Sequence, residues 1–163
     1  MDPARRSELV QRYQQGPIAV DAALHALKER ELDVRRGDEW TVREICHHLG
    51  DSEMRSAIRL RQLLAEDNPV IVGYDADAYA RTLFYDRRID WSLAAFRAAR
   101  ASTGEILERL SDEQWARNGT HTEEGPYGVE QWLETYAAHG HDHADQIRRT
   151  RSGGGRPVPQ SQA

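Results

Sequence analysis

Three histidines lie close together in residues 135–147 of the sequence, at positions 139, 141 and 143. Residues four apart on an α-helix share one face and lie about 6 Å apart along the axis. His139 and His143 can therefore hold one metal ion between them, whereas His141 points to another side. The pair continues the apolar face of its helix. Two neutral imidazoles side by side on a buried face indicate that something binds between them.

The spacing of this histidine pair also occurs by chance or on a solvated helix face. The zinc-protease form of the spacing carries a glutamate directly after the first histidine, as general base. Gly140 occupies that position here, which excludes that class of protease. A metal site would need at least one further ligand from elsewhere in the chain.

His48 is the candidate for that ligand. It follows Glu44 by four residues and precedes Asp51 by three, so the three side chains share one side of a helix. A histidine beside Ile45 and Leu49 is also typical of a core residue that is satisfied by hydrogen bonds. The residues alone leave both interpretations open.

The elements that would position these histidines are four long helices. Their apolar periodicity covers residues 7–33, 42–65, 91–110 and 129–150. Gly16 and Pro17 predict a kink in the first helix, or two abutting helices. Residues 41–44 and 111–114 match the capping box that starts a helix, and the second match predicts a short helical turn.

The connections are predicted as loops at 68–79 and 118–128, with a short helix from about Asp75. His121 lies in the second loop and could approach a site, because loops often carry functional residues. No convincing strand is visible. The sequence therefore predicts an all-α four-helix bundle, formed by a single domain over residues 1–150, with a flexible tail at 151–163.

Composition limits the function classes. The 163 residues carry a formal net charge of −5, which argues against a general nucleic-acid binder. The single cysteine, Cys46, excludes an internal disulfide framework and fits a reducing compartment. No apolar run approaches the ~20 residues that cross a bilayer, and no signal-peptide core is visible. We expect a cytoplasmic protein that binds a small-molecule substrate and no nucleic acid or membrane, with a homodimer possible.

Three segments resemble the DinB/YfiT-like family. They are WTVREICHHLGDSE at 40–53, EDNP at 66–69 followed by Tyr74 and Asp75, and YAAHGHDHADQI at 136–147. The resemblance covers roughly residues 7–150. It implies an up-and-down type of four-helix bundle and one divalent metal held by three histidines. Carried over by motif, the ligands are His48, His139 and His143.

The same resemblance assigns His47 to the family's non-ligand first histidine. Asp142 and Gln146 stand where some members of the family have further histidines. Gln146 shares the face of the histidine pair and could contact a substrate or a bound water. Neither departure removes a ligand.

Three neutral imidazoles leave coordination positions open, which is typical of a catalytic rather than a structural metal site. Imidazole does not select the metal decisively, so we expect zinc or nickel, with iron or manganese as alternatives. Asp51 and Glu44 are candidates to orient a ligand or transfer a proton, or else are solvated helix charges.

Two enzyme classes follow from the resemblance. One is a metal-dependent hydrolase, in which the metal activates water. The other is an S-transferase for a low-molecular-weight thiol such as bacillithiol or mycothiol, in detoxification or stress response, whose thiol would contact side chains such as Arg55, Arg59, Tyr74 and Tyr127. A non-catalytic metal-binding stress protein is the third alternative.

Overall fold

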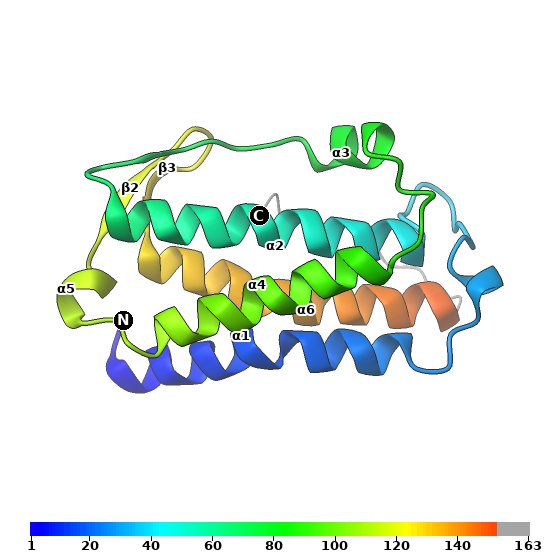
Figure 1. Ribbon diagram of the computed structural model, residues 1–163, viewed down its shortest axis with the longest axis horizontal. Helices are drawn as coiled ribbons and strands as arrows, with labels where there is room; N and C mark the ends of the chain where they lie inside the picture. Colours follow the sequence, from blue (N-terminus) through cyan, green and yellow to red (C-terminus); the bar gives the residue numbers. More distant parts are fainter. Residues whose placement is uncertain (153–163) are drawn as a thin grey trace.

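The computed structural model describes residues 1–152 and contains four long helices joined by short elements (Figure 1). The long helices are α1 (Pro3–Leu24), α2 (Val42–Ala65), α4 (Asp90–Leu107) and α6 (Val129–Ser152). The short elements are the 3-10 turn η1 (Glu29–Glu31), the helices α3 (Ala76–Thr82) and α5 (Asp112–Trp115), and the strands β1 (Val70–Ile71), β2 (Asn118–His121) and β3 (Gly125–Gly128). The predicted four-helix bundle is confirmed.

Both predicted capping boxes are present. The Thr41 amide donates to Glu44 Oε2 at 2.7 Å, and the Glu44 amide donates to Thr41 Oγ1 at 3.2 Å. Ser111 and Gln114 make the same two bonds at the start of α5. These bonds satisfy amides that would otherwise have no partner in the first turn of a helix. They fix the start of α2 and so place His48 in its second turn.

The four long helices run as two parallel pairs (Figure 1). Helices α1 and α6 run in one direction, and α2 and α4 run in the other. The connection between α2 and α4, which includes α3 and which we call the crossing segment, runs back along α2, so α4 starts again at the end where α2 began. The expected up-and-down order is therefore wrong in this respect, because the connection between α2 and α4 is long enough to cross the bundle. Helix α1 packs mainly on α6, and α2 packs on both α4 and α6.

Helix α1 is continuous through Pro17, so the alternative of two abutting helices is wrong. Proline has no amide hydrogen to donate to the carbonyl four residues earlier, which belongs to Tyr13. Arg100 Nη1 donates to that carbonyl instead, at 2.6 Å. The bond lost at the proline is thus replaced by one from another helix.

The first helix also ends earlier than predicted. After Leu24 the chain turns through Ala26, which has a positive φ of 57°. The turn lets Leu32 return to the core, where it is 4% exposed, and its carbonyl accepts from the Arg43 amide. The apolar residues up to position 33 therefore follow a helix and a separate turn, which periodicity did not distinguish.

A small sheet replaces the two predicted loops. Strand β1 pairs in parallel with β2, and β2 pairs antiparallel with β3. A side chain at Gly119 would overlap the Pro69 carbonyl, and that carbonyl accepts from the Thr120 amide at 2.9 Å. The strands are short and rich in glycine. They form because of such contacts between distant segments. The local sequence therefore shows no alternation of apolar and polar residues that would predict a strand.

A buried ion pair joins all four long helices. Arg100, on α4, is 1% exposed and donates from Nε to Glu53 of α2 at 2.7 Å. It also donates to the carbonyl of Tyr13 on α1 and, at 2.8 Å, to that of Tyr136 on α6. Glu53 accepts a further bond from the Tyr13 hydroxyl. We call these four residues the Arg100 network.

Glycines make room for the Arg100 network. A Cβ at Gly16 would overlap Arg100 Nη1, and one at Gly140 would lie 3.2 Å from the Gly16 Cα. Gly140, which separates His139 from His141 in the sequence, therefore serves close packing of α1 on α6.

The predicted tail begins with Arg151 and Ser152, which are in fact the last residues of α6. Its remaining residues, 153–163, lie outside the described part of the chain. None of the helices within residues 1–152 is long and apolar enough to span a membrane.

Candidate metal centre

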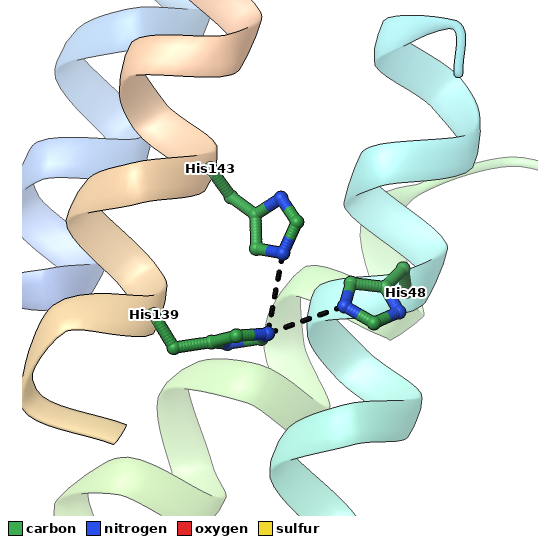
Figure 2. A group of neighbouring side chains, drawn as sticks. All are labelled: His48, His139 and His143. Atoms are coloured by element: carbon green, nitrogen blue, oxygen red, sulfur yellow. Dashed lines mark hydrogen bonds between the residues drawn. The ribbon is translucent and has the colours of Figure 1, made fainter. Parts of the chain in front are cut away.

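The side chains of His48, His139 and His143 converge between α2 and α6 (Figure 2). His139 Nε2 lies 3.2 Å from His48 Nε2 and 3.2 Å from His143 Nε2. One nitrogen of each ring lies within 4.8 Å of the others. Helix α6 supplies the predicted pair four residues apart, and the packing of α2 on α6 brings in the third ring.

Hydrogen bonding does not account for this geometry. A neutral imidazole nitrogen carries either one hydrogen or one lone pair in the ring plane, so His139 Nε2 can satisfy only one of its two short contacts. A tetrahedral metal with bonds of about 2.0–2.1 Å to nitrogen holds neighbouring ligand nitrogens about 3.3 Å apart. The observed separations fit three lone pairs that share one cation.

Burial keeps these rings neutral. It lowers the pKa of His48 and of His139 well below the usual value of 6.5, and neighbouring histidines lower both further. Burial also lowers the pKa of His143 to about 4. Neutral rings have the lone pairs that a metal requires. His143 is the partly exposed member of the group.

Gln146 orients one of the ligands. Its Oε1 lies 2.8 Å from His143 Nδ1, and since an amide oxygen only accepts, Nδ1 must carry the hydrogen. The Nε2 lone pair of His143 then faces the other two rings. The His48 ring is instead oriented by packing, since it lies edge-on to Trp40 with ring centroids 4.8 Å apart. The Nδ1 atoms of His48 and His139 are buried and bond to no residue within 1–152.

Two acidic candidates lie outside the three-histidine group. Asp51 Oδ2 accepts from the Tyr85 hydroxyl at 2.7 Å. Glu44 caps α2 and pairs with Arg35 at 2.6 Å, so it has a structural role. A role for Asp51 in proton transfer stays a prediction.

The remaining histidines near the site face elsewhere. His47 donates from Nε2 to the Arg87 carbonyl at 3.0 Å, and its Nδ1 lies 2.8 Å from Ser92 Oγ, so it ties α2 to the segment that begins α4. His141 bonds to the Arg12 carbonyl on α1. His121 is buried on β2, 2% exposed, and is outside the metal-binding group.

Sequence reasoning missed the continuity of a polar stripe on α2. Ser52, Ser56 and Arg59 follow His48 at positions that share its face, and all three are buried. Arg59 Nη1 donates to the hydroxyl of Tyr136 at 2.9 Å, next to the histidine pair on α6. The sequence does contain a pattern that predicts this stripe, because polar residues recur at helical spacing on the face of α2 that was assigned to the core.

Comparison with known proteins places these residues in a family. Residues 12–147 match the DinB superfamily. The chain is 35% identical over 122 residues to a protein of Oceanobacillus iheyensis named "Putative metal-dependent hydrolase", which covers 74% of this chain and 71% of that one. It is 30% identical over 147 residues to YfiT of Bacillus subtilis, which bears the same description. That alignment covers 88% of this chain and 82% of YfiT.

A solved structure shows the same architecture. YfiT from Bacillus subtilis, described as a "probable metal-dependent hydrolase with an unusual four-helix bundle topology", superposes with a TM-score of 0.86 at 28% identity. The match covers 94% of this chain and 90% of YfiT. The extent of these matches and the predicted sequence motifs agree, and this chain belongs to the DinB superfamily.

Proposed function

We propose that this protein is a metal-dependent hydrolase that acts on a small molecule at the three-histidine centre. The observation that carries the proposal is the convergence of three neutral Nε2 atoms, 3.2 Å apart across His139, at a group with one partly exposed member. The names of the relatives support the same class of reaction. The exposed side of His143 is where a substrate would approach.

A divalent metal bound by these three ligands would supply a Lewis acid and lower the pKa of water at an open position. The residues of this chain do the rest. His48, His139 and His143 hold the cation, and Gln146 keeps His143 in the tautomer that presents Nε2. We propose zinc or nickel as the metal, since both accept imidazole ligands, with iron or manganese as alternatives.

The metal proposal is tested by elemental analysis of the purified protein. We expect about one transition metal per chain, and its loss in each of His48→Ala, His139→Ala and His143→Ala. His141→Ala is the matched control, because His141 lies on the same helix but bonds to the Arg12 carbonyl. Absence of metal from the wild type after addition of zinc and of nickel would rule out the proposal.

A finer variant tests the role of Gln146. Gln146→Leu keeps the size of the side chain but removes the acceptor for His143 Nδ1. Partners of this kind typically change metal affinity by about 10–100-fold. A competition titration with a chelator should show a loss of that size, and equal affinities would mean that packing alone orients His143.

The reaction class is tested with the metal-loaded protein on a panel of chromogenic esters and amides, with and without a low-molecular-weight thiol. Hydrolysis predicts turnover without thiol that is lost in His139→Ala. Thiol transfer stays a prediction, and on this panel it would instead require the thiol and yield a thioester, with release of the alcohol or amine. A metal-loaded protein without turnover on any of these would favour the non-catalytic alternative.

A further inference from the structure

Arg59 is a buried cation without a carboxylate partner. It is 5% exposed, and no acidic side chain within residues 1–152 forms an ion pair with it. Its Nη1 donates to the Tyr136 hydroxyl at 2.9 Å and its Nη2 to the Val72 carbonyl at 3.0 Å. Its Nε is buried and has no partner in this part of the chain. Only two of its five N–H donors are used in these bonds, both on neutral acceptors.

A second arginine converges on the same point. Arg55 Nη2 donates to the Val72 carbonyl at 3.1 Å, so one oxygen accepts from both guanidinium groups. Arg55 also donates to the Tyr79 hydroxyl and lies over the Tyr74 ring at 4.6 Å. Two like charges that meet at one carbonyl repel each other, and here Arg59 is buried while Arg55 is partly exposed. An anion bound beside them would remove this penalty.

Other buried polar atoms accompany the two arginines. His121 Nε2 is buried and has no hydrogen-bond partner within residues 1–152, while Ser52 Oγ and Tyr74 Oη have none apart from each other. Burial raises the pKa of Tyr74 and lowers that of His121, and the nearby charge of Arg59 opposes the first shift and adds to the second. Leaving a buried polar atom without a partner is unfavourable. These groups from α2, the crossing segment and β2 form a polar cluster, which we call the Arg59 cluster, whose chemistry suits an oxyanion.

The neighbouring carboxylates are unable to fill this role. Glu53 is held by Arg100 and by the Tyr13 hydroxyl. Asp51 accepts from Tyr85. Glu123 and Glu124, which follow β2, are exposed, and the Glu123 carboxylate lies against Gly73. Neither forms an ion pair with Arg55 or Arg59, so no carboxylate within residues 1–152 is in direct contact with the Arg59 charge.

The Arg59 cluster and the three-histidine centre lie along one face of α2. His48, Ser52, Arg55 and Arg59 follow each other at helical spacing, about 16 Å from first to last along the axis. Long side chains on a helix lean toward its N-terminus, which here is toward His48. Tyr136 spans the remaining gap, because its hydroxyl accepts from Arg59 and its ring lies 5.9 Å from that of His139.

We propose that Arg59 and Arg55, with Tyr74 and His121, bind an oxyanion group of the substrate, a carboxylate or a phosphate. The reacting group of the same molecule would lie at the three-histidine centre, and this second part rests on the proposed function. The substrate class is thus an elongated anionic small molecule with its charge at one end and its reactive bond at the other.

The test follows the Nε–H resonances of arginine by NMR in metal-free protein, during titration with inorganic phosphate and with succinate at constant ionic strength. The Arg59 signal is identified by its absence in Arg59→Gln. It should shift saturably, and Arg55→Gln should weaken the binding about tenfold, the loss expected for one charged hydrogen bond. Arg61 is the internal control, because it lies on the same helix but donates to Ala57, Ser102 and Thr103.

An Arg59 signal that does not move with either anion, or that moves only together with the Arg61 signal, would overturn the proposal. Tighter binding of phosphate or of succinate identifies the group, and either result supports a built anion site. The same titration of His139→Ala separates the two proposals. Anion binding should persist in that variant, whereas the metal is lost, and anion binding that vanishes with the histidine would contradict a separate anion site.

Discussion

Two buried arginines in this bundle have opposite surroundings. Arg100 contacts a carboxylate and two backbone carbonyls, and it joins all four long helices. Arg59 is almost as buried but bonds only to one hydroxyl and one carbonyl. The first charge is compensated by the fold itself, and the second is not. Burial alone therefore does not distinguish a structural charge from a functional one. The presence or absence of a carboxylate partner does.

The difference also separates two parts of the molecule. The Arg100 network lies at the packed centre, where Gly16 and Gly140 make room for it. Arg59 lies where α2 meets the crossing segment and the small sheet, which join segments far apart in the sequence. A site that exchanges ligands needs such a region, because elements with few buried contacts open more readily than the core.

The largest effect should come from breaking the compensated pair. Arg100→Met leaves Glu53 buried without its cation, and removing one partner of a buried pair typically costs about 3–5 kcal/mol. Urea unfolding should show a loss of that size in the free energy of unfolding. A loss below about 1 kcal/mol would mean that the network is not a principal support of the bundle.

A smaller loss should follow from Gly16→Ala. The added methyl group would overlap Arg100 Nη1, and overpacking of this kind costs about 1–3 kcal/mol. Gly104→Ala is the matched control, because its Cβ would lie 3.1 Å from the end of the flexible Gln14 side chain. That variant should be neutral or gain up to about 1 kcal/mol from helix propensity. Equal thermal unfolding of both variants would refute the packing argument.

The smallest effect on stability should come from Arg59→Met. It removes an uncompensated charge along with two hydrogen bonds to neutral acceptors, so we expect the free energy of unfolding to stay within about 1 kcal/mol of the wild type. Urea unfolding beside Arg100→Met gives the comparison directly. A loss as large as that of Arg100→Met would show that Arg59 also supports the fold.

Much of the fold could be predicted from local patterns. The capping residues Thr41 and Ser111 start two helices where predicted, and apolar periodicity located all four long helices. The sheet was missed because Gly119 and its neighbours form strands through contact with Pro69, far away in the sequence. Pro17 predicted a kink or two abutting helices, and the sequence could not show that the Tyr13 carbonyl, which Pro17 leaves free, accepts a bond from Arg100 of another helix.

The candidate metal centre was predictable to a similar degree. The spacing of His139 and His143 indicated a shared face, and His48 was a candidate third ligand from its own helix. Only the family resemblance chose a ligand over a core histidine there, because no local rule relates positions 91 residues apart. The exact partner of Gln146 was also beyond the sequence, since spacing gave its face and not its bond to His143. The Arg59 cluster was not predicted, because the spacing of residues does not show that a buried arginine lacks a carboxylate partner.

The pairing of α1 with α6 sets an order of events during synthesis. The main packing partner of the first helix is the last one, so the apolar face of α1 stays uncovered on the ribosome until residues near 150 have emerged. His48 likewise meets His139 only after the intervening 90 residues have been made. Closure of the bundle and assembly of the three-histidine group are therefore late and coincident steps in folding.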